Sequence, residues 1–245
     1  MQKFEYISTL GVAGKLPGYI PEEELPEREF HNHYERTKSR SESEVLAAYK
    51  ENGLPVTIHR PSMIIGHSQT GKNIRFQGFY FLSKLFTGRQ TFGCLPSLPD
   101  LTFDLIPSDY IAQIISCSLN TPAETIGRIF HLCSGADYAI SCTDLIKYLR
   151  HYHKTRSQNL PKTIFISPTL FLLGMKIMAS LSFNPKLKKS VKGIANYFRH
   201  IKTIQTFENT QTRAFFEQHG IMLEYPENYL GRVLDYYGVN KRNIK

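Results

Sequence analysis

A tyrosine and a lysine spaced four residues apart are the groups in this sequence best suited to acid–base chemistry. Tyr34 and Lys38 lie in a segment with helical periodicity, so their side chains would share one face of a helix. A free tyrosine has a pKa of about 10 and is a poor acid–base group at neutral pH. A neighbouring ammonium favours the phenolate and moves that pKa toward the working range, so the pair could exchange a proton with a substrate oxygen.

The spacing alone is a weak signal, and the context of each pair decides its interpretation. It occurs three times, at Tyr34/Lys38, Tyr80/Lys84 and Tyr237/Lys241. Tyr80/Lys84 lies in the apolar run FYFLSKLF, where a packed tyrosine beside a lysine with a buried stem is expected. Gly238 interrupts the third pair. The first pair follows a short strand pattern, FEYIST (4–9), which ends in two hydroxyl residues, Ser8 and Thr9.

The elements around the first pair follow the order strand, helix, strand. FEYIST breaks into the glycine-rich LGVAG, and residues 15–31 form a connector rich in proline and glutamate. A helical pattern begins at Asn32 and stops at Gly53, and the β-branched run LPVTIHRPSMIIG (54–66) follows. This order predicts a parallel sheet with a right-handed crossover. The carboxyl ends of such strands share one crevice, so the hydroxyl pair, the Tyr–Lys face and the end of the second strand would converge there.

A second unit of the same kind follows. TFDLIPS (102–108) reads as a strand, Ser108 or Asp109 could cap the helix DYIAQIISCSL, and RIFHLC (128–133) reads as another strand. Beyond Ser141 the pattern is mainly helical. The sequence therefore predicts the α/β class, with a partial Rossmann-like parallel sheet and a mainly helical region.

Composition, charge and cysteine spacing limit the classes of protein and partner that the sequence predicts. The chain of 245 residues is 41% hydrophobic, enough to bury a core, and its net charge of +9 favours an anionic partner. It contains neither a zinc-finger spacing nor an RNA-binding aromatic signature, so we predict no nucleic-acid partner. The four cysteines are widely spaced among apolar residues and are expected to be reduced thiols, with no metal site. With no signal-peptide pattern at the start, we predict a cytoplasmic location.

The most apolar stretch spans residues 163–183. Ser167 and Pro168 are typical of a helix cap and first turn, which leaves a helix shorter than the roughly 20 residues needed to span a bilayer. We expect a buried or substrate-lining helix rather than a membrane-associated one. The basic run from Lys186 to Lys202 could steer an acidic carrier protein or form a solvated face.

Two other motifs suggest different enzymes, and both are incomplete. GHSQTGKN (66–73) is close to a P-loop, but Asn73 stands where a Ser or Thr would bind magnesium. GHS (66–68) begins like the nucleophile elbow of a serine hydrolase, but position 70 lacks the second glycine. We therefore disfavour nucleotide hydrolysis and serine hydrolysis.

Four segments together resemble a known family. STLGVAG, YERTK, GLPVTIHRPSMIIGHSQTGKN and FDLIPSDYIA, in this order and at these intervals, resemble the thioester reductase domains of polyketide and peptide synthetases and their fatty acyl reductase relatives. The resemblance covers about residues 4–135, and FHLCS and FENTQTRAFFEQHGI extend it weakly. It implies an extended short-chain dehydrogenase fold, an oxidoreductase that uses NADPH or NADH to reduce an acyl thioester, on CoA or an acyl carrier protein, to an aldehyde and sometimes to an alcohol.

The resemblance also implies roles for individual residues. Thr9 would hydrogen-bond the carbonyl oxygen, Tyr34 would donate the proton, and Lys38 would hold the nicotinamide ribose while lowering the tyrosine pKa. Ser8 remains the alternative to Thr9 as hydroxyl donor. The backbone that would face the nicotinamide belongs to Pro61, Ser62, Met63 and Ile64.

The resemblance divides the chain into two regions. Residues 1–135 would be the C-terminal half of a Rossmann-like NAD(P)-binding domain, with 67–102 an excursion to the substrate side. Residues 136–245 would be the helical substrate-binding region.

One feature of the family is missing from the sequence. No glycine-rich strand–turn–helix holds a G-x-G-x-x-G motif, so the adenine half of the cofactor has no visible site. We therefore expect this chain alone to bind NADPH weakly or not at all, and a complementing N-terminal segment is a candidate partner. The alternative function is a catalytically silent or split-gene fragment that acts as a binding or structural subunit.

Overall fold

The structure of this chain is a computed structural model, and it describes residues 2–181 and 205–240. The backbone forms two compact units, each assembled from segments that are distant in sequence. Among the described residues, the first unit comprises 2–75, 104–139 and 205–240, and the second comprises 76–103 and 140–181.

The compact units divide the chain differently from the predicted functional domains. The prediction separates a nucleotide-binding region, 1–135, from a helical region, 136–245, by function, and this division stays a prediction. In the structure, the last helices of the chain belong to the same compact unit as the parallel sheet. The basic run between Lys186 and Lys202 lies outside the described residues, so its steering role also stays a prediction.

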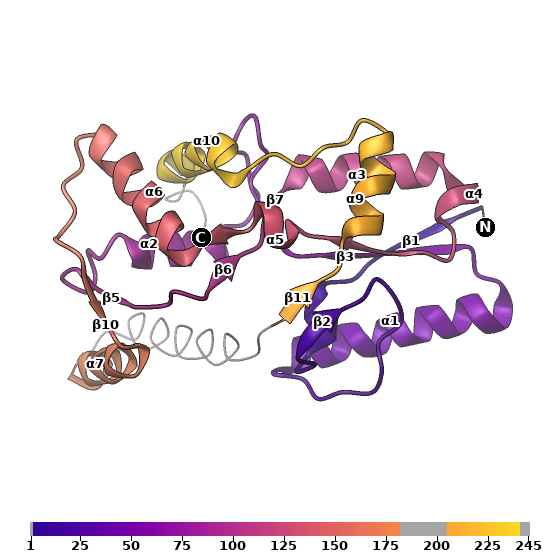
Figure 1. Cartoon of the computed structure of the whole chain (residues 1–245), viewed down its shortest axis with the longest axis horizontal. Coiled ribbons are helices and arrows are strands. Elements are labelled where there is room, and N and C mark those ends of the chain that lie inside the picture. Colours follow the sequence, from indigo (N-terminus) through magenta and orange to yellow (C-terminus); the bar gives the residue numbers. More distant parts are fainter. Residues whose placement is uncertain (1, 182–204, 241–245) are drawn as a thin grey trace. The chain divides into compact units, whose positions relative to one another are not determined.

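A three-stranded parallel sheet forms the centre of the first unit (Figure 1). Its strands, in the order β1-β3-β8, are β1 (Phe4–Ile7), β3 (Val56–Pro61) and β8 (Ile129–Leu132). In the register of the sheet, Phe4 pairs with Val56, and Ile58 pairs with Ile129. The parallel pairing confirms the predicted α/β class.

The helix that bears the candidate acid–base pair is α1 (His33–Asn52). The side chain of Asn32 accepts a hydrogen bond from the Glu35 amide and caps the first turn. Gly53 ends the helix in the left-handed conformation, at φ 65°, which a glycine adopts without steric cost. Both ends of the helix therefore lie where the sequence pattern predicted them.

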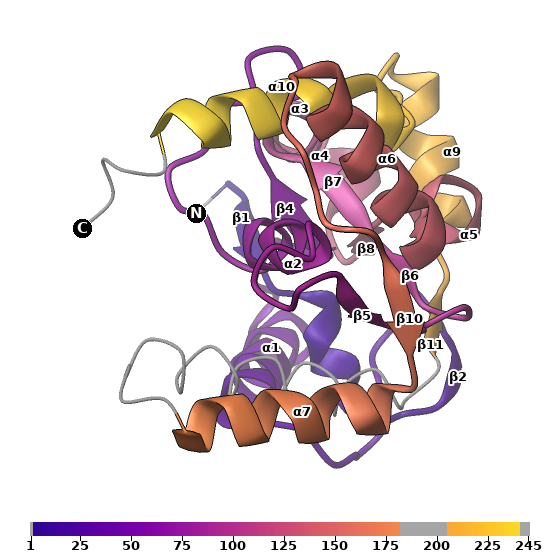
Figure 2. The same cartoon turned by 90° about the vertical axis from the view of Figure 1, so that its left-hand side faces the viewer.

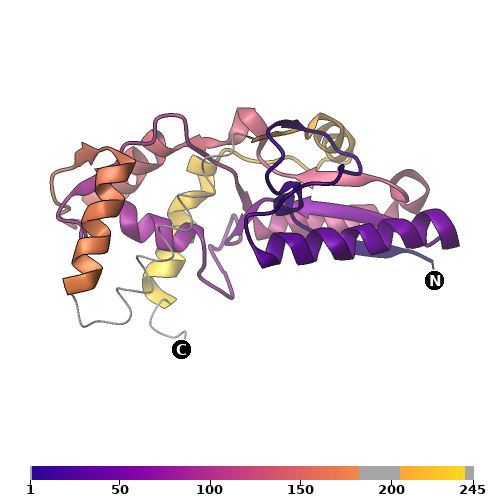
Figure 3. The same cartoon turned by 90° about the horizontal axis from the view of Figure 1, so that it is seen from below.

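Side chains alternate between the two faces of the sheet, and each face is covered by different helices. On one face, Leu46 of α1 packs against Val56 and Ile58, and Figure 3 shows α1 running alongside the strands. On the other face lie α3 (Ser108–Asn120) and α9 (Thr210–Gln218).

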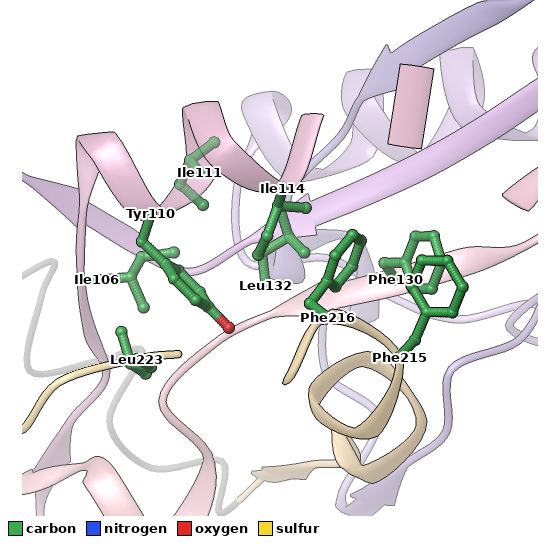
Figure 4. Close-up of a cluster of buried hydrophobic side chains, with 9 residues drawn as sticks. All are labelled: Ile106, Tyr110, Ile111, Ile114, Phe130, Leu132, Phe215, Phe216 and Leu223. Atoms are coloured by element: carbon green, nitrogen blue, oxygen red, sulfur yellow. The ribbon is translucent and has the colours of Figure 1, made fainter. Parts of the chain in front are cut away.

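The second face holds a cluster of buried apolar side chains (Figure 4). Phe130 and Leu132 of β8 contribute to it, and the rings of Phe215 and Phe216 from α9 lie 5.7 and 4.9 Å from that of Phe130. The cluster joins β7 (Leu105–Pro107), α3, β8 and α9 and consists of Ile106, Tyr110, Ile111, Ile114, Phe130, Leu132, Phe215, Phe216 and Leu223. It fixes the sheet from the side opposite to α1.

Two runs predicted as single strands are each divided in the structure. Residues 54–66 form β3 and then β4 (Met63–Ile65), which pairs with β7 (Leu105–Pro107) in a separate parallel sheet. The run 102–108 likewise divides at Asp104 into β6 (Thr102–Phe103) and β7. The Asp104 carboxyl is buried and accepts a hydrogen bond from the Ser134 amide, at 2.8 Å.

The predicted cap of α3 was wrong. The helix begins at Ser108, and its N-cap, Pro107, provides no side-chain hydrogen bond. The Asp109 carboxylate instead accepts hydrogen bonds from the Ser68 amide and hydroxyl, at 2.7 and 2.6 Å. The Asp109 carboxylate, which the local pattern assigned to the helix end, is therefore hydrogen-bonded by Ser68, a residue distant in the sequence.

Six further elements complete the described part of the first unit. They are η1 (Leu10–Ala13), β2 (Gly18–Ile20), α4 (Pro122–Thr125), α5 (Gly135–Tyr138), β11 (Gln205–Phe207) and α10 (Pro226–Asn240). β2 and β11 pair in parallel, which brings the connector before α1 next to the segment before α9.

The second unit combines helices with short strand pairs (Figure 2). Its elements are α2 (Phe79–Phe86), β5 (Cys94–Pro96), β6, β9 (Ile140–Ser141), α6 (Cys142–Thr155), β10 (Ile164–Ile166) and α7 (Pro168–Leu181). β5 and β10 lie side by side in parallel, whereas β6 and β9 are antiparallel.

The apolar stretch 163–183 contains α7, whose beginning the sequence predicted. The Leu170 amide donates to the Ser167 hydroxyl at 3.3 Å, so Ser167 caps the helix as expected. One face of α7 is buried through Phe171, Met175 and Ala179, whereas Leu170, Leu173 and Ile177 are each at least half exposed. Among the described residues, none of the helices combines the length and apolarity that crossing a bilayer requires.

Candidate active site

The carboxyl end of β1 and the start of α1 lie in direct contact. The Lys38 ammonium donates a hydrogen bond to the Ile7 carbonyl oxygen, at 2.8 Å, and lies 5.4 Å from the centre of the Tyr6 ring. Ile7 is the last residue of β1, so the lysine is held where the strand ends. The end of β1 and the helix that bears Tyr34 and Lys38 therefore lie together, as the strand–helix order predicted.

Thr9 begins the short helix that follows β1. Its hydroxyl oxygen accepts a hydrogen bond from the Gly11 amide, at 3.2 Å, and caps η1. Gly11 packs close to α1, because a Cβ atom added there would lie 3.3 Å from Cγ of Glu35. Thr9 is thus two residues from the Lys38 contact and close to the first turn of α1.

Tyr34 lies in that first turn, and its side chain faces solvent. The residue is 60% exposed, and Lys38 follows it one turn later on the same helix. In the part of the chain that the structure describes, no hydrogen bond joins the Tyr34 phenol to Lys38 or Thr9. The direct contact among the three groups, and their catalytic roles, therefore stay predictions.

Ser8, the alternative hydroxyl donor, has a different environment. It is 4% exposed, and its hydroxyl makes no hydrogen bond with the residues that the structure describes. Its amide donates to the His59 carbonyl oxygen of β3, at 2.7 Å. Ser8 is therefore part of the sheet edge, whereas Thr9 belongs to the turn beyond it.

Substitutions of these two residues should have different effects on stability. Thr9→Val removes both the hydroxyl and the cap of η1, so we expect slower turnover and a loss of about 1 kcal/mol in the free energy of unfolding. Ser8→Ala should leave that free energy unchanged or raise it, because a buried hydroxyl without a partner is unfavourable. Urea unfolding and turnover assays measure both effects, with Thr9→Ser as the conservative control. Loss of turnover in Ser8→Ala alone would instead identify Ser8 as the donor.

The segment predicted to face the nicotinamide lies at the carboxyl end of β3. Pro61 is the last residue of β3, and the Ser62 amide donates to the Leu132 carbonyl oxygen at 2.9 Å. Met63 and Ile64 begin β4, and Ile64 is 42% exposed. The segment therefore lies where the central strand of the sheet ends. The neighbouring strand is β1, whose last residue, Ile7, accepts the hydrogen bond from Lys38.

A buried polar network beneath this edge was missed from the sequence. The fully buried Arg60 guanidinium bonds the Glu42 carboxylate of α1, with Nη2 2.6 Å from Oε1, and donates from Nη1 to Nε2 of His131, at 3.0 Å. Nδ1 of His131 lies 2.7 Å from the Glu208 carbonyl oxygen and is assigned as the protonated nitrogen. Burial, and next the charge of Arg60, lower the pKa of His131 to about 3, so the imidazole is neutral at physiological pH. One signal in the sequence could have indicated Glu42, because this residue follows Lys38 by four positions on the predicted helix.

The loop 66–73 does not have the geometry of a P-loop or a nucleophile elbow. Its Gly71 amide donates to the His67 carbonyl oxygen, and its His67 amide to that of Lys72, at 2.8 and 3.0 Å. A P-loop needs such amides free to bind phosphate. The Ser68 hydroxyl donates to Asp109 rather than to a histidine, so the Ser–His contact of a nucleophile elbow is not made by this serine.

Nearly half of the chain matches a known protein-family model. Residues 2–115 match the family model described as Male sterility protein. Among curated proteins, the aldehyde reductase lnaA of Aspergillus flavus is 33% identical over 88 residues, 36% of this chain and 8% of that protein. The nonribosomal peptide synthetase hkm10 of Aspergillus hancockii is 23% identical over 197 residues, 79% of this chain and 19% of that protein. The chain therefore matches less than a fifth of the length of either relative.

Solved structures extend the similarity over nearly the whole chain. The terminal R domain from the myxalamid PKS-NRPS biosynthetic pathway has a TM-score of 0.74 at 21% identity, covering 99% of this chain and 59% of that one. The thiolation-reductase di-domain of an archaeal non-ribosomal peptide synthetase has a TM-score of 0.69 at 22% identity, covering 98% and 49%. At these identities the likeness concerns the fold. The chain thus shares the fold of these reductase domains, and its residues 2–115 resemble the male sterility protein family.

Proposed function

We propose that this chain carries the catalytic groups of an NAD(P)H-dependent reductase of acyl thioesters. The observation that carries the proposal is the Lys38 ammonium, which is held at the carboxyl end of β1 by the Ile7 carbonyl oxygen. Ligands of parallel α/β sheets bind beyond this edge. The family match supports the same reaction class, because the relatives include proteins named as aldehyde reductases.

The residues at the sheet edge suit a nicotinamide cofactor. Lys38 has three N–H donors, of which one is used by Ile7, and no carboxylate lies within 4 Å of it among the described residues. The remaining donors could hold ribose hydroxyls. The backbone of residues 61–64 and the half-exposed Ile64 side chain would lie against the nicotinamide. When bound, the cofactor would supply a hydride to the carbonyl carbon of the thioester.

The chain's own groups would act on the carbonyl oxygen. The Thr9 oxygen accepts from Gly11, which leaves its proton to donate to the substrate oxygen. Tyr34 would transfer its phenol proton to that oxygen as negative charge develops there. The resulting hemithioacetal loses the thiol and leaves an aldehyde, and a second round of the same steps would give an alcohol.

The thiol that leaves would belong to a pantetheine arm on an acyl carrier protein or CoA. A net charge of +9 on this chain would favour such acidic partners. One of the similar structures is described as a thiolation-reductase di-domain, which supports a carrier-bound substrate.

Thioester-dependent consumption of NADPH tests this proposal. The chain is incubated with saturating NADPH or NADH and an acyl-pantetheine thioester, and the reduced nicotinamide absorbance and trapped aldehyde are measured. We expect one aldehyde for each nucleotide oxidised, and little reaction with the matching oxoester. Lys38→Met serves as the inactive control. Nucleotide oxidation that does not depend on the thioester would refute the proposal. The absence of any nucleotide oxidation at saturating nucleotide would refute it as well.

A further inference from the structure

A buried ion pair connects α1 to the central strand of the sheet. The side chains of Arg60 and Glu42 are 1% and 3% exposed. Nη2 of Arg60 lies 2.6 Å from Oε1 of Glu42, and Nε lies 3.2 and 3.3 Å from its two oxygens. A guanidinium holds a carboxylate in a fixed planar arrangement, so the pair sets both the distance and the rotation of α1 relative to β3.

The same face of α1 carries the proposed catalytic groups. Tyr34, Lys38 and Glu42 follow each other at intervals of four residues, so they lie one above another on one side of the helix. Glu42 is about 12 Å along the axis from Tyr34. Arg60 directly precedes Pro61, where the proposed nicotinamide-facing segment begins. The pair thus joins the two elements that must stay in register for the reaction.

Arg60 is itself held from the other side. Its Nη1 donates to Nε2 of His131 on β8, and Nδ1 of His131 bonds the Glu208 carbonyl oxygen, next to β11. The guanidinium therefore cannot follow a movement of α1. A second connection joins α1 to η1, because Arg28 donates to the Ser39 hydroxyl of α1 and to the Val12 carbonyl oxygen.

We propose that Glu42, acting through Arg60, is a positioning residue that fixes the Tyr34–Lys38 face of α1 against the carboxyl end of β3. The inference rests on the proposed function for its catalytic meaning. Small displacements of reacting groups can slow an enzyme by about 100-fold. Loss of this pair should therefore lower kcat strongly and change KM little, since Glu42 lies beneath the site and does not line it.

The test separates positioning from stability with a double substitution. Replacing a buried ion pair with apolar residues of similar volume is often neutral or stabilising. Glu42→Leu/Arg60→Met should therefore remain folded but lose the directional contact, and we expect its kcat to fall 10- to 100-fold. Glu42→Gln should show a smaller fall in kcat. Glu44→Gln is the matched control, because Glu44 lies on the same helix in an exposed pair with Arg40.

A second readout does not depend on turnover. Lys38 lies over the Tyr6 ring, so the NMR signals of its terminal methylene should show a ring-current shift. We expect this shift to disappear in the folded double variant and to persist in Glu44→Gln. A parent chain without reductase activity would refute the proposed function, while the NMR shift would still decide the positioning. A folded double variant with the parental shift or the parental kcat would overturn the inference.

Discussion

In the complete protein, replacement of Tyr34 by phenylalanine is expected to abolish thioester reduction while leaving NADPH affinity nearly intact. The substitution removes the proton donor, and general acid catalysis contributes about 100- to 10,000-fold to a rate. The side chain is 60% exposed, and the structure shows no hydrogen bond from the phenol to described residues. The free energy of unfolding should therefore change by less than about 0.5 kcal/mol. Turnover, calorimetric NADPH titration and urea unfolding measure the three quantities.

Tyr19→Phe provides a matched control for this substitution. Tyr19 is also 60% exposed, and it lies on β2 in the same compact unit. It should retain parental turnover, so a fall specific to Tyr34→Phe cannot be attributed to the loss of a surface hydroxyl. Parental turnover in Tyr34→Phe would remove Tyr34 from the mechanism and leave Thr9 or a bound water as the proton donor.

Local signals in the sequence predicted the helix that bears the candidate site. Asn32 and Gly53 mark the two ends of α1 through contacts that each makes with its own neighbours. The strand divisions at Ser62 and Asp104 could not be predicted in this way. An apolar run has the same periodicity whether it pairs with one sheet or with two, and the partner strands lie about 40 or more residues away.

Non-local contacts also explain what the sequence did not reveal about the site. Asp109 has the position of a helix cap, but Ser68 binds its carboxylate. Glu42 is on the correct helix face, yet its burial depends on an inward arginine of β3, a residue type that is usually exposed. The spacing predicted that Tyr34 and Lys38 share a face. Where the Tyr34 phenol points depends on its side-chain torsions, which spacing does not determine.

The free energy of unfolding should fall steeply as the pH is lowered from about 6.5 toward 3, with His131 as a major cause. Burial, and next Arg60, lower the pKa of His131 from 6.5 to about 3 in the folded chain. Between these values the unfolded chain binds a proton that the folded chain does not. The stabilisation is therefore complete above pH 6.5 and is lost as the pH falls through 3. One histidine could contribute up to about 5 kcal/mol.

His131→Gln isolates this contribution. A glutamine oxygen could still accept from Arg60, but the amide does not titrate, so the variant should be less stable than the parent at pH 7 and lose less stability on acidification. Burial raises the pKa of Asp104, so protonation of this carboxyl changes the free energy of unfolding in the opposite direction. Asp104 is present in both the parent and His131→Gln, so its contribution cancels when the two are compared. Urea unfolding at several pH values gives the two slopes, with the exposed His151→Gln as control. Equal slopes in the parent and His131→Gln would show that the imidazole is already hydrated in the folded state, and that the Glu42–Arg60–His131 network is more open than its distances indicate.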